Sequence, residues 1–202
     1  MDLVISHVYK DFGRGPVLRD VSLTVRQGET VCLMGPSGLG KTTLLRCVAG
    51  LERPESGSIT GVPERLGYVF QEDRLLDGLT ATANIRAPHG RMRGAELAAF
   101  LARERAALAS VGLPVDARPV RELSGGQRRR VSILRCALAD ADALFFDEPL
   151  KGMDDATVGR VMAFLLPEME GRTVFWVTHD ERELAWFPRA ERWHVAGGTA
   201  RR

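Results

Sequence analysis

The sequence predicts an α/β protein with a buried parallel sheet, and three observations support this fold class. Several short runs are apolar at nearly every position, as strands covered on both faces are; they are 30–34, 143–147 and 172–178. A glycine-rich loop at 35–40 joins the first run to a helical segment that begins at Lys41. The stretch 79–138 has the three- and four-residue apolar spacing of amphipathic helices.

Length and composition indicate a single soluble domain. The chain has 202 residues, of which 45% are apolar and 27% charged, so it can bury a substantial core. Its net charge of +2 is too small to indicate nucleic acid or an anionic membrane as a direct ligand. No apolar run reaches the ~20 residues of a membrane span, and the N-terminus lacks the pattern of a secretory signal. Cys32, Cys47 and Cys136 have no metal-type spacing, and we expect buried, reduced thiols in the cytoplasm.

The N-terminal part predicts two strands and a turn. Residues 3–9 and 17–26 alternate in the manner of strands, and the turn 27–29 leads into the apolar run before the glycine-rich loop. Phe12 or Tyr9 could stack on a nucleotide base, although a core position explains either aromatic equally well.

Residues 35–42 read Gly-Pro-Ser-Gly-Leu-Gly-Lys-Thr, between a strand and a helix, which is the setting of a phosphate-binding loop. Glycines let backbone N–H groups curl around phosphate oxygens, and the following helix directs its positive end at the same anion. Lys41 can contact the β- and γ-phosphates, and the Thr42 hydroxyl can ligate Mg²⁺. A glycine-rich turn matching by chance is disfavoured by this flanking order. The predicted nucleotide contacts are Gly35, Pro36, Ser37, Gly38, Leu39, Gly40, Lys41, Thr42 and Thr43.

A glutamine follows the next pair of predicted strands. The helix from Lys41 is expected to end at Gly50, and residues 58–60 and 66–70 predict short strands. Gln71 comes directly after the second of them, where its amide could reach Mg²⁺ or a water bound to it. Taken alone, Gln71 would be an ordinary loop residue.

The helical stretch contains a second candidate anion site. Residues 123–127 read Leu-Ser-Gly-Gly-Gln and open a helix predicted over 128–139. Exposed N–H groups at such a helix start can bind an anion. A simple helix cap explains Ser124, but it does not explain two consecutive glycines followed by glutamine. We therefore assign Ser124, Gly125, Gly126 and Gln127 to a second anion-binding site.

Two acids end the apolar run 143–147. Asp147 closes the strand and can hold Mg²⁺, and Glu148 could polarise a water for attack on the γ-phosphate. Two exposed turn acids would be the alternative interpretation, but their place at the end of a buried strand argues against it.

His179 also stands at the end of a predicted buried strand. His179 follows the strand 172–178, where it could hydrogen-bond the γ-phosphate or orient the attacking water. Beyond it the sequence predicts a helix around 181–186 and an edge strand through 193–195, and His7, His89 and His194 receive no assignment.

Together these motifs resemble the ATP-binding cassette family, the ATPase subunits of ABC transporters, over essentially the whole chain. The intact Leu-Ser-Gly-Gly-Gln between Gln71 and Asp147 distinguishes this family from other nucleotide-binding proteins. The spacing of residues 10–13 before Val17 resembles the adenine-stacking loop and favours Phe12 over Tyr9. The resemblance identifies 35–42 as Walker A, 143–147 as Walker B, Glu148 as the catalytic glutamate, Gln71 as the Q-loop, 123–127 as the signature and His179 as the switch histidine.

Two positions depart from the family pattern. The D-loop, which usually reads close to Ser-Ala-Leu-Asp, is Lys-Gly-Met-Asp at 151–154. The family often has a second glutamine after the signature, where this chain has Arg129. Neither change removes a catalytic group, but both bear on coupling between subunits.

The resemblance implies a RecA-like P-loop core with a small N-terminal antiparallel β-subdomain and an inserted helical subdomain. The whole chain, 1–202, would be one ATPase domain, with 1–75 and 136–202 forming the core and 76–135 the helical part. Two copies would pair head to tail, so that ATP and Mg²⁺ lie between the Walker motifs of one copy and Ser124–Gln127 of the other. Lys41 and Gln71 would join Glu148 and His179 in catalysis.

The resemblance also implies partners in a membrane. Integral-membrane permease subunits would contact the stretch 73–79 and place the chain at the inner face of the cell membrane, with a substrate-binding protein in the complex. The length and the segment after Gln71 resemble importers of nitrate, sulfonates, taurine and related small solutes. An exporter or lipid-handling ATPase is the main alternative, and a soluble ATPase acting on DNA or ribosomes is a further one.

Overall fold

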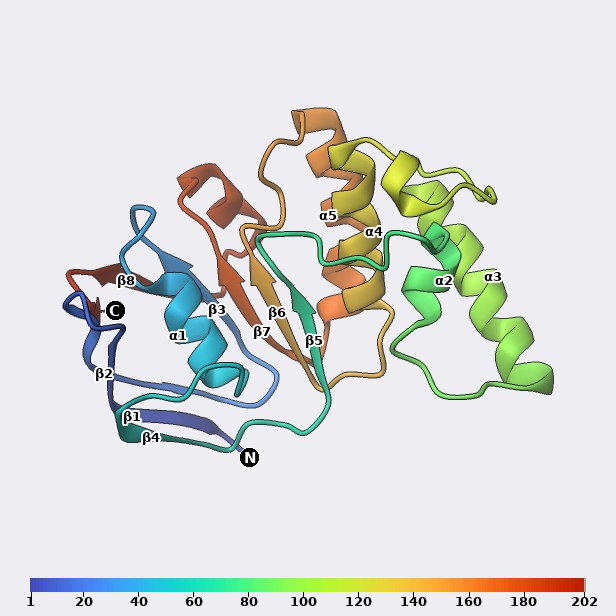
Figure 1. Cartoon of the computed structure of the whole chain (residues 1–202). Helices are drawn as coiled ribbons and strands as arrows, with labels where there is room; N and C mark the ends of the chain where they lie inside the picture. Colours follow the sequence, from blue (N-terminus) through green and yellow to red (C-terminus); the bar gives the residue numbers. More distant parts are fainter. Residues whose placement is uncertain (202) are drawn as a thin grey trace. The chain divides into compact units, whose positions relative to one another are not determined.

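The computed structural model describes residues 1–201, which form two compact units. Of the described residues, 1–66, 142–148 and 171–201 form the first unit, and Gly67–Ala141 and Pro149–Glu170 form the second. Figure 1 follows the chain through both by colour.

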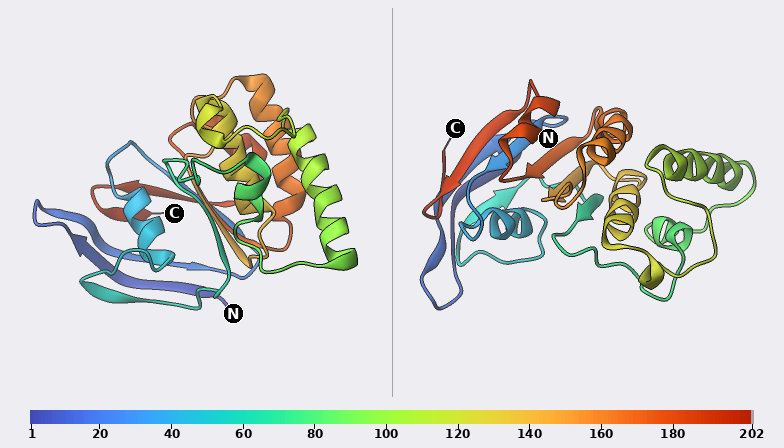
Figure 2. Two further views of the ribbon diagram at one scale, coloured as in Figure 1. Left: turned by 45° about the vertical axis from the view of Figure 1, so that its right-hand side comes forward. Right: turned by 90° about the horizontal axis from the view of Figure 1, so that it is seen from above.

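The first unit contains an antiparallel sheet of strands β1 (Leu3–Asp11), β2 (Pro16–Val25) and β4 (Ser56–Thr60). Their order is β2-β1-β4, and Figure 2 shows β1 beside both neighbours. Leu3, Ile5 and Val8 are buried, while Val4 and His7 are exposed. The alternation shifts by one residue between Ile5 and Val8, where the pairing with β2 is irregular and His7 has a positive φ of 53°. The predicted N-terminal antiparallel β-subdomain is therefore confirmed.

The second sheet of this unit is mainly parallel. Within the unit its strands run in the order β6-β7-β3-β8-β9, with β9 antiparallel to β8 and the others parallel. Every residue of β6 and β7 is buried, which explains why both read as continuous apolar runs. The strand bounds are β3 Thr30–Met34, β6 Ala143–Asp147, β7 Thr173–Val177, β8 Glu191–Ala196 and β9 Thr199–Arg201.

The prediction of an edge strand through 193–195 was wrong. β8 lies between β3 and β9, because the turn at Gly197–Gly198 returns the chain as one further antiparallel strand. Two glycines with positive φ make this tight turn possible.

Aromatic side chains fill the core on both faces of this sheet, because consecutive residues of a strand point to opposite faces. The rings of Phe145 and Phe175 stack with centroids 5.1 Å apart, and Phe146 lies 5.1 Å from Trp176. Each fully buried aromatic contributes about 1.5–3 kcal/mol to stability relative to an exposed one. Helix α1 (Lys41–Val48) contacts β6 and β7 and ends before Gly50, whose φ of +69° allows the chain to turn. The three cysteines are free and buried, as predicted.

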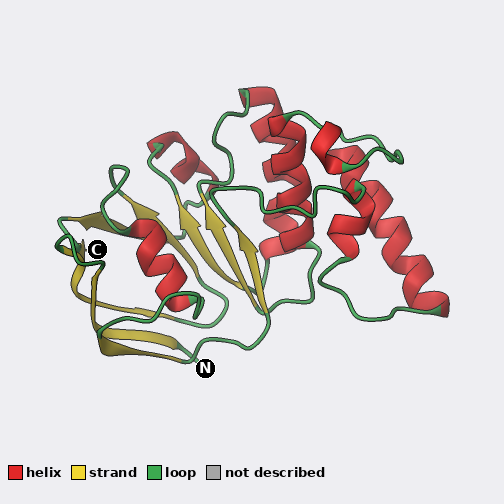
Figure 3. Ribbon diagram, in the orientation of Figure 1, coloured by secondary structure: helices red, strands yellow, loops and turns green. Residues whose placement is uncertain are grey.

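The second unit is helical (Figure 3). Strand β5 (Leu66–Val69) leads into it. The apolar spacing predicted within 79–138 is buried at Phe100 and Leu108 of α3 and at Val111, which follows that helix. Glu104 on the same helix is only 1% exposed and pairs with Arg86, which neutralises its charge. The helices are α2 Ala81–Arg86, α3 Gly94–Ser110, α4 Gly125–Ala137 and α5 Asp155–Met169, with a 3₁₀ turn η1 at Val120–Glu122.

The division of the chain differs from the expected one. We expected a helical part of 76–135, whereas the structure also groups 67–75, 136–141 and 149–170 with it. The reason is that α5 contacts both α3 and α4, and its inward side chains Val161, Met162 and Leu165 are buried. Among the described residues, no helix combines the length and apolar character needed to cross a membrane.

Candidate active site

The loop 35–40 connects β3 to α1 at the carboxyl edge of the parallel sheet. Gly35 has φ of +137°, and a Cβ there would lie 2.3 Å from the Val195 carbonyl oxygen. At Gly40, with φ of +98°, a Cβ would lie 2.8 Å from the Val17 carbonyl oxygen. Both positions therefore require glycine, because neighbouring backbone occupies the space of any side chain.

Lys41 is held inside this loop. Its side chain is nearly fully buried, and Nζ donates to the carbonyl oxygens of Gly35 at 2.6 Å and Pro36 at 2.8 Å. Burial lowers the pKa of Lys41, while the nearby charges of Glu148 and Asp147 raise it and offset part of that effect. The ammonium is thus fixed where an anion in the loop would meet it.

The two predicted Mg²⁺ ligands of the first unit lie together. Thr42 Oγ1 donates to Asp147 Oδ1 at 3.1 Å, although 105 residues separate them in sequence. Asp147 is 1% exposed at the end of β6, and Thr42 lies in the first turn of α1. A hydroxyl and a carboxylate are hard oxygen donors, so this pair fits Mg²⁺.

Glu148 and His179 form a second close pair. His179 Nδ1 lies 3.1 Å from Glu148 Oε1, and the carboxylate is buried while the imidazole is half exposed. The backbone of Glu148 has φ of +48°, a left-handed conformation that is unusual for a residue other than glycine. Its N–H donates to the Val177 carbonyl oxygen at 3.0 Å, which fixes the turn after β6. Such strained positions cluster at functional sites.

The segment that carries His179 is held by a glutamate that sequence reasoning missed. Glu183, on the 3₁₀ helix η2 (Glu181–Trp186), accepts from Trp176 Nε1 at 2.7 Å and from the Thr178 hydroxyl. Burial raises the pKa of Glu183, and these two hydrogen bonds lower it in part. The two bonds hold the residues immediately before and after Val177, the last residue of β7. The only signal for Glu183 in the sequence is its position four residues after His179.

A hollow of about 410 Å³ adjoins the loop. Residue 194, to which the sequence analysis assigned nothing, lines it because β8 pairs with β3 in a register that sets His194 opposite Met34. That register depends on tertiary structure and cannot be read from the sequence. The lining residues are Met34, Gly35, Pro36, Ser37, His179, Glu181 and His194.

Phe12 lies in the turn between β1 and β2 and is 55% exposed. Lys10 Nζ is 4.8 Å from the ring centroid and is itself held by Glu52 at 2.8 Å and Glu55 at 3.1 Å. Tyr9, in contrast, belongs to β1 and is partly buried. Of the two aromatics, Phe12 therefore has the ring that is open to a ligand.

The remaining predicted site residues lie in the second unit. Gln71 follows β5, is exposed, and its carbonyl oxygen accepts from Arg129 Nη1 at 3.4 Å. Ser124 caps α4: its Oγ accepts from the Gln127 N–H at 3.3 Å, and the Gln127 Oε1 accepts from the Ser124 N–H at 2.9 Å. This reciprocal capping occupies both side chains. A Cβ at Gly125 or Gly126 would meet nothing within 4 Å, so this helix start is open.

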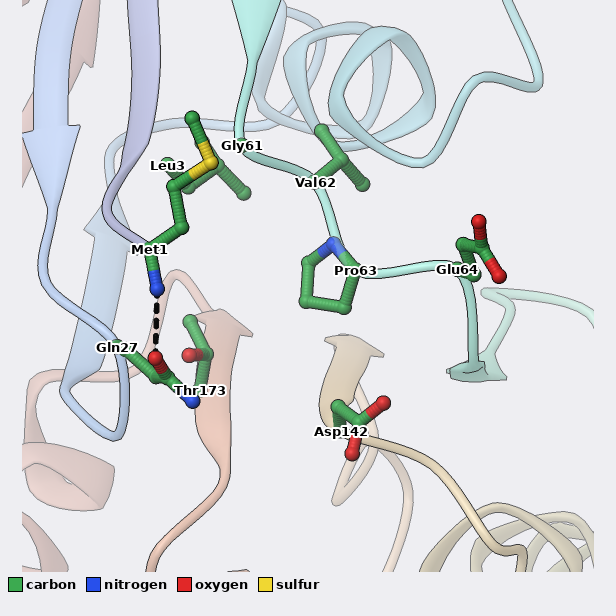
Figure 4. Close-up of a pocket in the computed structure, with 9 residues that line it drawn as sticks. All are labelled: Met1, Leu3, Gln27, Gly61, Val62, Pro63, Glu64, Asp142 and Thr173. Atoms are coloured by element: carbon green, nitrogen blue, oxygen red, sulfur yellow. Dashed lines mark hydrogen bonds between the residues drawn. The ribbon is translucent and has the colours of Figure 1, made fainter.

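Another cavity of about 410 Å³ lies at the amino ends of β6 and β7 (Figure 4). Its walls include Asp142 and Thr173, and the Met1 ammonium donates to Gln27 Oε1 at 2.6 Å on one side. None of the predicted site residues reaches it. Ligands of parallel α/β sheets bind at the carboxyl edge, where Lys41, Asp147 and Glu148 lie.

Comparisons with known proteins give one family. The sequence profile described as ABC transporter matches residues 18–151. The sulfate/thiosulfate import ATP-binding protein CysA 2 of Rhizobium meliloti is 38% identical over 91% of this chain. The taurine import ATP-binding protein TauB of Escherichia coli O157:H7 is 38% identical over 90% of this chain and 74% of its own length. This chain spans only 54% of the CysA 2 sequence.

Solved structures that resemble this chain are also ATP-binding cassettes. The dimeric structure of MJ0796, a bacterial ABC transporter cassette, has a TM-score of 0.85 and 28% identity, covering 99% of this chain and 97% of that one. A dimeric post-hydrolysis state of the ATP-binding cassette MJ0796, bound to ADP and phosphate, has a TM-score of 0.84 with the same coverage. The predicted cassette fold is confirmed.

Proposed function

The chain belongs to the ABC transporter family, and we propose that it binds and hydrolyses ATP as the motor subunit of such a transporter. The observation that carries this proposal is the pair of contacts at the carboxyl edge of the parallel sheet. There Thr42 meets Asp147, and Glu148 meets His179, directly behind the loop that holds Lys41.

The loop supplies the phosphate-binding part. Its backbone N–H groups and the start of α1 provide partial positive charge, and Lys41 adds a full charge. A phosphate oxygen placed in the loop would replace the Gly35 and Pro36 carbonyl oxygens as the acceptor for Nζ. The exposed ring of Phe12 is available to stack on adenine.

Thr42 and Asp147 would hold Mg²⁺, and Gln71 from the second unit would add a side-chain oxygen. Mg²⁺ held there would supply positive charge that offsets the negative charge of the nucleotide phosphates. The fit rests on the Thr42–Asp147 contact, which already places two oxygen donors 3.1 Å apart. The other residues of the site act on the nucleotide and on water.

Glu148 would act as the general base. Its carboxylate would accept a proton from the attacking water as the water oxygen approaches the γ-phosphorus. His179 holds Glu148 Oε1 through Nδ1, which leaves Nε2 free to contact the γ-phosphate or the water. The buried carboxylate and the half-exposed ring suit these two roles.

We further propose that two copies complete each site. Ser124, Gly125 and Gly126 form an open helix start. The phosphate-binding loop that holds Lys41 belongs to the other unit. A second copy could place this helix start on the γ-phosphate held by Lys41 of the first. The MJ0796 cassette is dimeric, which supports the pairing of two copies.

The transport role is proposed from the relatives. The names of CysA and TauB describe import of sulfate, thiosulfate and taurine, and we propose that this chain drives import of a small solute of that kind. It would do so with integral-membrane permease subunits at the inner face of the cell membrane and a substrate-binding protein. The stretch 73–79 would contact the permease.

Replacement of the proposed base tests this function. Glu148→Gln should retain ATP affinity, lose nearly all turnover and accumulate an ATP-bound dimer, because the amide cannot accept the proton. ATP binding, phosphate release and size-exclusion chromatography with ATP measure the three effects. Lys41→Ala is the matched control, which should lose affinity and stay monomeric. Wild-type turnover by Glu148→Gln would refute the role of Glu148.

A further inference from the structure

Arg129, on α4, is the arginine that stands where the family often has glutamine. It is 6% exposed, and Nε donates to the Pro149 carbonyl oxygen at 3.0 Å. Nη1 donates to the carbonyl oxygens of Phe70 and Gln71. All of these residues belong to the second unit, and they come from three separate segments of the chain.

A carboxylate balances the buried charge. Asp73 Oδ1 lies 3.5 Å from Arg129 Nη1, and its side chain is 19% exposed. A buried guanidinium is tolerated only when it is paired and hydrogen-bonded, and Arg129 has both kinds of partner. The pairing ties one further residue of the stretch after Gln71 to the same helix.

Two other arginines of α4, Arg128 and Arg135, bond the same stretch. Arg128 Nη2 donates to Asp77 Oδ1 at 2.8 Å. Arg135 donates to the carbonyl oxygens of Asp73 at 3.2 Å and Arg74 at 2.9 Å. Residues 70–77, here called the Gln71 segment, are thus fastened along α4 by side chains from three positions of the helix.

The chemistry of arginine explains why Arg129 can join more segments of the chain than a glutamine at the same position could. A guanidinium has five N–H donors in a planar fork on a long stem, whereas a glutamine amide has two on a shorter one. Arginine can therefore satisfy carbonyl groups of the Gln71 segment and of Pro149 at once. A glutamine would leave at least one of these two connections unmade.

We propose that Arg129 is a positioning residue that makes the Gln71 segment, the turn at Pro149 and helix α4 move as one piece. Pro149 follows Glu148 directly, and Ser124 caps the same helix. A displacement of the Gln71 segment would then be transmitted to the helix start at Ser124 and to the chain beside Glu148. The consequence for catalysis rests on the function proposed above, whereas the connection itself does not.

Hydrogen exchange on the intact protein without nucleotide tests the connection. Arg129→Gln should speed backbone exchange in residues 70–77 by about ten- to a hundredfold, because hydrogen bonds to a charged group are lost. Arg129→Lys keeps the charge but not the fork and should give an intermediate increase. Arg103→Gln is the matched control, since Arg103 bonds Glu168 between α3 and α5 and touches neither Gln71 nor Pro149. It should leave exchange in 70–77 unchanged.

Steady-state kinetics tests the consequence. Arg129→Gln should lower kcat by roughly 10- to 100-fold while ATP affinity stays at the wild-type value, because Lys41 and its loop lie in the other unit. A purely structural loss would instead lower affinity and turnover together, in proportion to the fraction unfolded. Circular dichroism monitors folding, and Asp73→Asn, which weakens the same connection without removing the arginine, should repeat the kcat effect if Arg129→Gln does not fold.

Unchanged exchange in residues 70–77 of folded Arg129→Gln would overturn the inference, whatever the kinetics show. An equal change in Arg103→Gln would overturn it as well. Faster exchange together with a wild-type protein that hydrolyses no ATP would refute the proposed function and leave the connection standing. The two failures are therefore distinguishable.

Discussion

His179 Nδ1 lies 3.1 Å from Glu148 Oε1, which joins residues that follow two neighbouring parallel strands, β7 and β6. The carboxylate is 8% exposed and the imidazole 48%. An ionised carboxylate only accepts, so Nδ1 is the donor of this contact when Glu148 is ionised. The buried base is thereby connected to a ring that faces solvent.

Removal of this ring should lower turnover without lowering affinity. His179→Ala is expected to reduce kcat by roughly 100-fold, since the base loses its orienting partner and the phosphate loses a donor. Filter binding of ATP should stay at the wild-type level, because Lys41 is untouched. His7→Ala, which removes an exposed histidine bonded to Asp20, provides the control. Equal losses in both variants would contradict the specific role of His179.

The Thr42 hydroxyl should determine the response to Mg²⁺. Thr42→Val keeps the shape of the side chain but removes the oxygen that contacts Asp147. The Mg²⁺ concentration that gives half-maximal ATPase activity should therefore rise by about tenfold or more. Thr42→Ser retains the hydroxyl and should remain close to the wild type. The measurement is ATP hydrolysis across a Mg²⁺ titration. Identical titrations for Thr42→Val and the wild type would exclude Thr42 as a ligand.

Mixing two inactive variants should restore activity if the sites are shared. Lys41→Ala damages the phosphate loop, and Ser124→Arg blocks the helix start on α4. In a head-to-tail heterodimer both changes fall in one composite site and leave the other intact. Hydrolysis by the mixture should exceed that of either parent alone. A mixture no more active than its parents would contradict the head-to-tail arrangement.

Glu183 should make stability depend on pH. Because burial raises its pKa above the ordinary value of 4.5, the folded protein binds this proton more tightly than the unfolded chain does. The resulting stability is present below the unfolded pKa and is lost as pH rises through the folded pKa. Glu183→Gln stays neutral, so its free energy of unfolding relative to the wild type should increase over that range and then level off.

Urea unfolding at a series of pH values measures this difference. Glu96→Gln removes an exposed carboxylate on α3 and controls for the loss of one negative charge. A relative stability of Glu183→Gln that falls with rising pH would show that the hydrogen bonds from Trp176 and Thr178 outweigh burial.

Features that depend only on residues adjacent in the sequence could be predicted from it. The phosphate loop, the capped start of α4 and the acids that end β6 each lie within one short stretch, and glycine content and apolar spacing are properties of the local backbone. The helical apolar spacing within 79–138 and the burial of the cysteines could be predicted for the same reason. Most predicted strand and helix limits differed from the structure by two residues or fewer. For example, the helix that was expected to end at Gly50 ends at Val48.

Features that depend on the order and register of strands could not be predicted in this way. The sequence identified Thr42, Asp147, Glu148 and His179 singly, but their pairing across 105 and 31 residues follows from the positions of β6 and β7 in the sheet. The place of β8 inside the sheet and the bonds of Glu183 have the same origin.

By itself, then, the sequence determined which chemical groups this protein has and that each stands at a strand end or a helix start. Only the tertiary structure decided which groups touch, because a contact between distant residues is set by strand pairing and by side-chain packing. Arg129 shows the difference most clearly. The sequence marked it as a departure from the family pattern, and the structure placed its guanidinium on the carbonyl oxygens of Phe70, Gln71 and Pro149.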